Sequence, residues 1–516
     1  MKLLNNSNHI KSYFHSYGKN IPSVVFLIFI INFQSLAAED QLHLLARQGI
    51  DLAATLQYEK AITVFDQLIQ AEPENPRGYF LKSAAYFWMF SADMHNQKIG
   101  DIFKQISYQA VDVAEKRLEE NEQDVNALFY LGGAYGSLGR YYGMTYSYLK
   151  SYWYGKKGVR YLEQVIELDS TYYDAYLGLG IYHYLADVLP KFVKVLSFLL
   201  GLEGDRDLGI QQLKLAAERG VYARIEALFF LGAIYTYRER DYKQAMNIWN
   251  QLLLRYPDNP GVLIHQGRCY ANMGYCQSAL DTYQKILDQK EIADRLPLAS
   301  VHYQLGNVYF KMNDFEAAIT AYKTALETDT INSEARRWTY PWSLYGLGQV
   351  YEILGQPQQA RDYYSQITDG ESEHAYDAAR RRLKNPMPEI EIDILVGKNY
   401  VHCRQFEQAE LYFQDLQKQL IEADPAQQEK WLPQIRYQVG DLRFYQLHYR
   451  EAIDIFSSLL ADRTLKDEKI KGWCHYKRAL SYRAIGETEK ARRDFKKAAE
   501  FDDDELKDNV DRVKNW

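Results

Sequence analysis

Apolar residues recur at helical spacing along most of the chain, and pairs of such segments follow one another. Two stretches share one frame: 264–287, IHQGRCYANMGYCQSALDTYQKIL, and 303–326, YQLGNVYFKMNDFEAAITAYKTAL. In each, a glycine is followed three residues later by a tyrosine and twelve residues later by an alanine, and a second tyrosine comes four residues after the alanine. This pattern predicts two amphipathic helices joined by a short turn, which is a helical hairpin.

The same frame returns from residue 42 to the end, in about eleven hairpins. A small residue leaves space where the two helices of a hairpin cross, and the aromatic residues fill the space beside the crossing. A single hairpin cannot cover its own apolar surface, so neighbouring hairpins must stack. The predicted fold is therefore all-α, a right-handed α-solenoid of stacked helix-turn-helix hairpins. The glycines of the frame are Gly49, Gly132, Gly180, Gly232, Gly267, Gly306, Gly348, Gly397 and Gly440.

Three early hairpins break the spacing. About fifteen extra residues stand between Tyr86 and Ala110, between Tyr135 and Gly158, and between His183 and Gly209, relative to the regular repeat. The inserts are compatible with helix, so we expect elongated or inserted helices in the N-terminal third.

The chain is expected to divide into four parts. Residues 1–37 read as a signal peptide, 42–222 as an N-terminal repeat region with long helical insertions, 223–385 as a regular array, and 389–516 as a C-terminal array. Two prolines, Pro386 and Pro388, mark the last boundary.

The N-terminal segment has the three parts of a secretory signal. Lys2, Lys11 and Lys19 form a basic region, 24–31 is an unbroken apolar run, and 35–37 supplies a small-x-small cleavage site. We expect cleavage and export to the periplasm or another extracytoplasmic site, with membrane attachment left open. The alternatives are an uncleaved anchor and a cytosolic chain with a chance apolar start. The apolar run alone is too short to span a bilayer, which needs about 20 residues.

Charge and cysteine content exclude several functions. The net charge of −7 argues against a general nucleic-acid binder, which needs a basic surface. Cys269 and Cys276 would lie about 10 Å apart on one helix, too far for a disulfide. We therefore interpret these two, together with Cys403 and Cys474, as small core or turn residues. No phosphate-binding loop, zinc motif or nucleophile elbow is present, so no catalytic residue, cofactor or metal ligand is predicted.

The second insert, within 135–162, is basic and aromatic and contains no acidic residue. Such a surface could hold an acidic peptide tail, a glycan or a lipid headgroup. The alternative, which we favour, is that the tyrosines pack the hairpin and the lysines are solvated. The candidate residues are Arg140, Lys150, Trp153, Lys156, Lys157 and Arg160.

The third insert holds the most apolar stretch outside the N-terminus. Its segment 190–203 predicts a helix with one narrow polar stripe. Three interpretations remain open: a core helix, a helix in a membrane interface, or a docking helix for a partner. Its apolar candidates are Phe192, Leu196, Phe198 and Leu199.

The hairpin signature looks like the tetratricopeptide repeat (TPR). A narrower resemblance covers 177–220, where Gly-x-Gly, Leu-Pro-Lys, Val-Leu-Ser-Phe-Leu and Gly-Asp-Arg-Asp-Leu-Gly follow in order. This block resembles the family of tetratricopeptide repeat protein thirty-nine and its yeast outer-membrane and inclusion-body-clearance relatives, and 338–367 is compatible with it. The family implies a helical, non-enzymatic adaptor associated with membranes or lipid bodies. The apparent signal peptide departs from the family.

We therefore predict a non-enzymatic scaffold that binds a protein or peptide partner and no nucleic acid. In TPR hairpins the first helix lines a concave groove. The alternative at each candidate position is a merely solvated polar residue. The alternative function is a peripheral membrane or lipid-associated protein that uses 190–203. The groove candidates are Arg268, Asn272, Tyr303, Asn307, Lys311, Tyr345 and Gln349.

Overall fold

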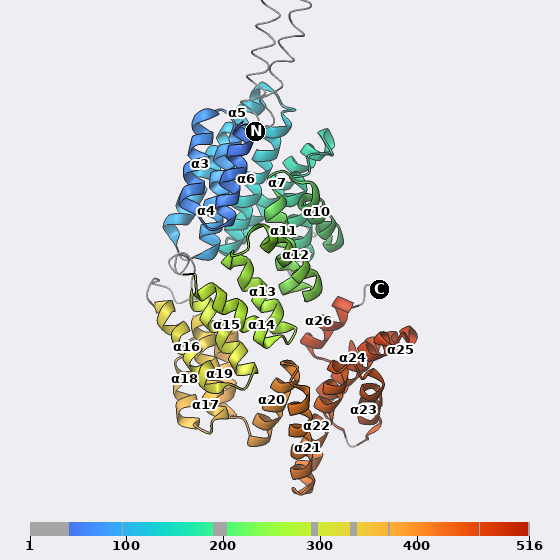
Figure 1. Cartoon of the computed structure of the whole chain (residues 1–516). Helices are drawn as coiled ribbons and strands as arrows, with labels where there is room; N and C mark the ends of the chain where they lie inside the picture. Colours follow the sequence, from blue (N-terminus) through green and yellow to red (C-terminus); the bar gives the residue numbers. More distant parts are fainter. Residues whose placement is uncertain are drawn as a thin grey trace, which may run out of the picture. The chain divides into compact units, whose positions relative to one another are not determined.

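The computed structural model describes residues 41–94, 96–188, 204–289, 298–330, 338–369, 372–463 and 465–513. Within these ranges the regular secondary structure is helical throughout (Figure 1). The chain divides into two compact units, Met1–Ala227 and Leu228–Trp516. The predicted signal peptide lies outside the described residues.

The first unit is a stack of helical hairpins (Figure 1). The prediction of elongated helices is confirmed for the first two inserts, because α5, α6 and α7 have 24, 20 and 21 residues. Most of the third insert, 189–203, lies outside the described residues. After a helix over 41–54, the elements are α3 Tyr58–Ala71, α4 Pro76–Ala92, α5 Gln97–Glu120, α6 Val125–Met144, α7 Tyr148–Leu168, α8 Ala175–Asp187, α10 Arg206–Arg219 and α11 Arg224–Ala233, which crosses the unit boundary.

The second unit continues with hairpins of more regular length. Its first complete element is η1, a short π-helix over Ile234–Arg238. Its other helices are α12 Tyr242–Arg255, α13 Pro260–Asn272, α14 Cys276–Leu287, α15 Leu298–Lys311, α16 Phe315–Thr330, α17 Thr339–Ile353, α18 Pro357–Ser365, α19 Glu373–Lys384, α20 Glu389–His402, α21 Phe406–Ile421, α22 Pro425–Tyr445, α23 Tyr449–Ala461, α24 Glu468–Ala484, α25 Thr488–Ala498 and α26 Asp504–Val513.

Short polar residues start many of these helices. Asn75, Asp124 and Asn259 each accept a hydrogen bond from a backbone N–H of the first turn, which would otherwise have no partner. Pro76 and Pro260 follow two of these caps at the first helical position, where a proline costs no hydrogen bond. The boundaries between hairpins are thus encoded locally.

Seven of the nine glycines of the frame lie against an aromatic ring of the second helix, whereas Gly132 and Gly180 lie against Leu162 and Leu213. A Cβ atom on Gly306 would come within 2.5 Å of Tyr322 Cδ1, and one on Gly397 within 2.5 Å of Phe413 Cε1. Both rings are fully buried. The aromatic residue therefore occupies the space that the missing side chain leaves, which explains why the two residues recur together.

We expect Gly306→Ala to lower the free energy of unfolding of the second unit by up to about 2 kcal/mol. Overpacking costs about 1–3 kcal/mol, and the better helix propensity of alanine returns about 1 kcal/mol. Gly136→Ala is the matched control, because Gly136 also lies within a helix and a Cβ there would meet nothing within 4 Å. This control should raise the stability of its own unit by about 1 kcal/mol. Urea unfolding of both variants measures the difference, and equal effects would contradict the packing role.

No helix in the part of the chain that the structure describes is both long and apolar enough to cross a bilayer.

Candidate functional site

The first helices of the central hairpins carry cations and almost no acids. The sequences of α13 and α15 contain no aspartate or glutamate. The one acid of α17, Glu352, is buried and accepts hydrogen bonds from the Tyr364 hydroxyl (2.9 Å) and from the Met387 N–H (2.5 Å). This face therefore presents positive charge that its own helices do not neutralise.

Arg268 of α13 lies among aromatic side chains. Its guanidinium carbon is 4.7 Å from the centre of the Tyr237 ring, and the Tyr237 hydroxyl lies 2.6 Å from His265 Nδ1. Burial raises the pKa of Tyr303 on α15, and the nearby Arg268 charge opposes that rise. Arg268 thus belongs to a surface shared by α13 and α15.

Tyr303, Asn307 and Lys311 follow one another at four-residue intervals on α15, so they share one side of the helix. Asn307 Oδ1 accepts a hydrogen bond of 2.9 Å from the Tyr322 hydroxyl. Burial, together with the nearby Lys398 of α20, lowers the pKa of Lys311 to about 8. Burial disfavours the charged ammonium, and a second cation adds repulsion.

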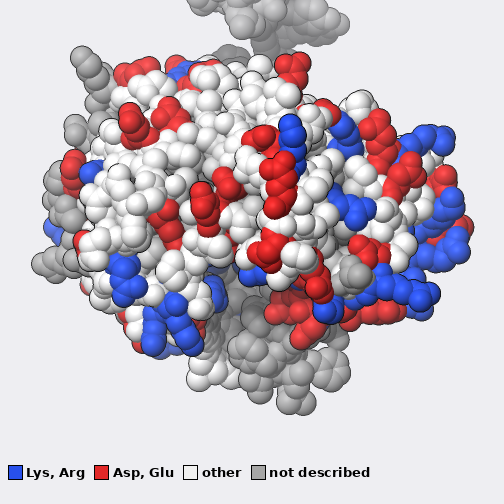
Figure 2. Space-filling model, turned by 90° about the horizontal axis from the view of Figure 1, so that it is seen from below, with Lys and Arg blue, Asp and Glu red and all other residues white. Residues whose placement is uncertain are grey.

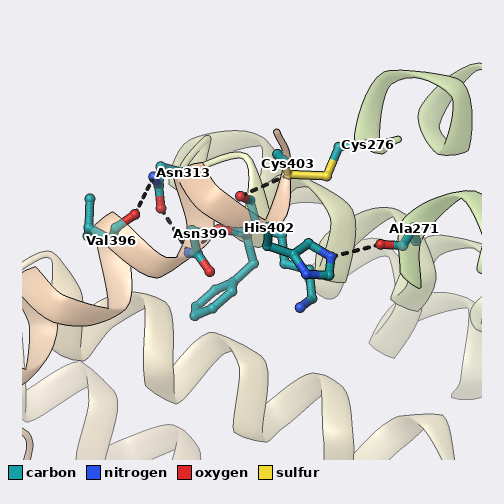
Figure 3. Close-up of a disulfide and its surroundings, with 9 residues drawn as sticks. Ala271, Cys276, Asn313, Val396, Asn399, His402 and Cys403 are labelled. Atoms are coloured by element: carbon teal, nitrogen blue, oxygen red, sulfur yellow. Dashed lines mark hydrogen bonds between the residues drawn. A yellow bond between two sulfur atoms is a disulfide. The ribbon is translucent and has the colours of Figure 1, made fainter. Parts of the chain in front are cut away.

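Helix α20 reaches this face because the chain of the second unit returns on itself. Cys276, the first residue of α14, forms a disulfide with Cys403, which directly follows α20, over a sequence separation of 127 (Figure 3). The interpretation of all four cysteines as unbonded core or turn residues is therefore wrong about the bonding of this pair, although Cys276 is buried and Cys403 lies in the turn after α20. It is confirmed for Cys269 and Cys474, which are free and buried. The error arose because the two bonded cysteines belong to different hairpins.

Hydrogen bonds on both sides of the disulfide hold α20 in place. His402 Nε2 lies 2.7 Å from the Ala271 carbonyl oxygen at the end of α13. Asn399 Nδ2 donates to the Phe310 carbonyl (3.0 Å) and to Asn313 Oδ1 (2.8 Å), and Asn313 Nδ2 donates to the Val396 carbonyl (3.2 Å), as Figure 3 shows in part. We call the disulfide and these contacts the clasp.

Gly274 shows how closely the clasp is packed. It lies in the turn between α13 and α14 with a φ of +80°, which favours glycine. A Cβ atom there would come within 2.1 Å of the His402 carbonyl oxygen. The end of α20 can therefore approach this turn only where a side chain is absent.

The clasp brings a second lysine to the cations of α13 and α15. Lys398 is exposed and lies one helical turn before His402. Among the described residues, no carboxylate pairs with Arg268, Lys311 or Lys398. We call Arg268, Asn307, Lys311 and Lys398 the cationic face.

The structure places the predicted groove residues on α13, α15 and α17. Arg268 lies near Tyr303, and Tyr303, Asn307 and Lys311 share one side of α15. Asn272 is exposed, and its side chain donates to the Arg268 carbonyl (2.8 Å). The ring of Tyr345 packs 5.5 Å from that of Tyr364, and Gln349 is half-buried on the same helix.

Sequence reasoning missed Lys398, although the repeat frame contained a signal for it. Lys398 follows Gly397 as Arg268 follows Gly267 and as Asn307 follows Gly306. Lys398 could therefore have been selected by its position in the repeat frame. The sequence around it, however, does not indicate that α20 returns to α15.

The basic-aromatic candidates of α6 and α7 separate into two groups. Arg140 pairs with Glu226 at 2.9 Å, and Lys157 lies 3.6 Å from Glu115 and donates to the Tyr135 hydroxyl. Trp153, by contrast, is 60% exposed. Lys150, Lys156 and Arg160 are exposed as well.

The candidates Phe192, Leu196, Phe198 and Leu199 lie outside the described residues.

The charge distribution varies over the surface. On the face seen in Figure 2, acidic and basic side chains both occur, and no field of a single sign covers it.

Family models of the tetratricopeptide repeat match two stretches of the chain, 226–370 and 473–501. One model matches 260–331 and 297–370, and a second matches 226–259 and 473–501. The chain carries tetratricopeptide repeats. All the residues of the cationic face except Lys398 lie within the matched segments. TPR arrays are protein-interaction scaffolds, and their fold is typically non-enzymatic.

Solved TPR structures resemble the chain at low identity. A tetratricopeptide repeat protein from Parabacteroides merdae is 16% identical, with a TM-score of 0.23 over 56% of this chain and 97% of its own. Yeast Tom70 is 14% identical, with a TM-score of 0.32 over 92% and 99%. YrrB, described as a TPR protein with an unusual peptide-binding site, is 21% identical, with a TM-score of 0.20 over 45% and 98%. These values carry no argument about function.

Proposed function

We propose that this chain is an exported, non-enzymatic TPR scaffold that binds an acidic, extended segment of a partner protein on the cationic face. The observation that carries the proposal is the set of three cations, Arg268, Lys311 and Lys398, without a carboxylate partner among the described residues. A ligand carboxylate would relieve the repulsion between the two lysines and would form charge-assisted hydrogen bonds. Asn307 and the neighbouring tyrosines offer polar contacts to the ligand backbone.

Lys311→Gln combined with Lys398→Gln should weaken binding of a labelled peptide rich in aspartate and glutamate by tenfold or more. Two lost charge-assisted contacts at about 1.5–3 kcal/mol each exceed that factor. Fluorescence anisotropy gives the affinity. Lys418→Gln, which removes an exposed lysine of α21, is the matched control and should bind as the parent does.

Two further measurements complete this test. A peptide with asparagine and glutamine in place of the acids should not bind, and added salt should weaken binding of the acidic peptide. Equal affinity of the parent and the double variant for the acidic peptide would contradict the proposed site.

The clasp disulfide supports the exported part of the proposal, because disulfides persist in oxidising compartments and are rare in the cytosol. With thiols alkylated before lysis and again after denaturation, intact-mass analysis should find a chain that begins at Ala38 or Glu39. Only two thiols, those of Cys269 and Cys474, should be alkylated. Four alkylated thiols on a chain that retains residues 1–37 would contradict export.

The narrower resemblance of 177–220 to the tetratricopeptide repeat protein thirty-nine family supports an adaptor role and remains a proposal. The alternative function, a peripheral membrane protein that uses 190–203, rests on a segment outside the described residues. Flotation with liposomes after Leu196→Asp and Phe198→Asp is its test: loss of flotation in a folded variant would favour it.

A further inference from the structure

The hairpin of α6 and α7 exposes a group of large apolar side chains at its end. Tyr146 lies in the turn, and Tyr148, Leu149 and Trp153 lie in the first two turns of α7. Their exposed fractions are 78%, 68%, 69% and 60%. Single exposed apolar residues are common on protein surfaces, but four within eight residues form a patch that calls for a partner. We call these four residues the tip cluster.

The tip cluster is not needed to hold the hairpin together. Inside the hairpin the Tyr142 and Tyr154 rings stack with their centres 5.2 Å apart, and the Tyr154 hydroxyl lies 2.8 Å from that of Tyr108. The turn itself is closed by a hydrogen bond of 2.8 Å from the Ser147 N–H to the Tyr142 carbonyl. The inner tyrosines therefore pack as core, while those of the tip cluster point to solvent.

Charge is arranged along the same outer face of α7. Leu149, Trp153, Lys156 and Arg160 are exposed and spaced by four, three and four residues, so they form one stripe along the helix. The apolar pair stands at the tip and the cationic pair further along. Residues 125–162 contain no aspartate or glutamate. The surface thus changes from apolar to cationic with distance from the tip.

We propose that the tip cluster inserts into the interfacial region of an anionic lipid bilayer, with Lys150, Lys156 and Arg160 against the headgroups. Tryptophan and tyrosine suit this region because each has an apolar body and a polar group, and lysine and arginine reach headgroups over apolar stems. An apolar element flanked by cations binds anionic membranes in two ways, by burial of its apolar surface and by attraction to the negative headgroups. The contact lies in the first unit and goes beyond the proposed peptide site, which lies in the second.

Other occupants fit this surface less well. A hairpin end is convex, whereas an extended peptide requires a groove for its backbone. A second copy packed symmetrically on the same patch would bring the two cationic stripes together, which is repulsive. A bilayer offers both a flat apolar layer and negative charge.

The first experiment labels the tip with an environment-sensitive nitrobenzoxadiazole group. Leu149→Cys provides the attachment site, and Leu254→Cys, on α12 and 86% exposed, is the matched control. The native thiols do not interfere, because Cys269 and Cys474 are buried and the other two cysteines are bonded to each other. Vesicles of phosphatidylcholine with phosphatidylglycerol should shift the emission at position 149 to the blue and leave position 254 unchanged. No shift at position 149, or equal shifts at both positions, would overturn the proposal.

The second experiment measures flotation of the full chain with the same vesicles. The combined variant Tyr148→Ser, Leu149→Ser and Trp153→Ser should bind at least tenfold more weakly, since each side chain loses its transfer free energy. The control Leu254→Ser and Leu411→Ser removes exposed leucines elsewhere and should bind as the parent does. Circular dichroism verifies folding. Undiminished flotation of the tip variant would place the membrane contact elsewhere in the chain, and the inference would fail.

Discussion

Removal of the clasp disulfide, by Cys276→Ser with Cys403→Ser, should lower the free energy of unfolding of the second unit by about 4–5 kcal/mol. The disulfide closes a loop with a sequence separation of 127, and a loop of that size restricts the unfolded chain by about this amount. Urea unfolding followed by tryptophan fluorescence measures the loss.

The parent protein itself supplies the control. Dithiothreitol should bring the parent to the stability of the double serine variant and should leave that variant unchanged, because the other two cysteines are free. The variant should also bind the acidic peptide more weakly, since the bond holds α20, and with it Lys398, next to Lys311. Equal stability of the parent and the variant would contradict a structural role for the clasp.

Acidification should destabilise the second unit well above the range in which carboxylates titrate. Burial lowers the pKa of His265 to about 3, and burial together with the nearby Lys311 lowers that of His402 to about 4. In the unfolded chain both groups titrate near about 6.5. The folded state therefore binds fewer protons below that pH, and its stability is complete above pH 6.5 and falls as the pH decreases. Each histidine contributes a loss of about 1.4 kcal/mol per pH unit.

The slope between pH 6.5 and 5 should thus be about 2–3 kcal/mol per pH unit for the two histidines together. Burial also lowers the pKa of His302, which adds to the slope. His402→Gln keeps a donor for the Ala271 carbonyl and should reduce the slope by about 1.4 kcal/mol per pH unit. Urea unfolding at a series of pH values gives the slopes. A flat profile for the parent would show that these histidines are not held neutral.

The hairpins were predictable because their signal is local. Gly306 and the ring above it, Tyr322, are sixteen residues apart, and caps such as Asn259 lie next to the helices that they start. The tyrosines of α6 and α7 were only partly predictable. Helical spacing indicates that Tyr142 and Tyr154 can share a core, but only the structure shows that Tyr148 and Trp153 remain outside it.

The clasp could not be predicted, because it depends on how small rotations between successive hairpins accumulate. Cys276 and Cys403 lie in different hairpins, and neither has a sequence neighbour that indicates the bond. Lys311 was identified as a groove candidate from its position in the frame, while its neighbour Lys398 required the return of α20. Local sequence therefore defines the parts of the cationic face, and the curvature of the array brings them together.

The central claim is that an acidic segment binds between α13, α15 and α20. The most direct measurement is zero-length carbodiimide cross-linking of an aspartate- and glutamate-rich peptide to the folded protein, with the attached lysines identified by mass spectrometry. The account predicts that Lys311 and Lys398 carry most of the peptide, and that a Lys311→Gln, Lys398→Gln variant carries little. The account would be contradicted if the peptide were attached to lysines of other helices, such as α21 and α25, and if the double variant carried as much peptide as the parent.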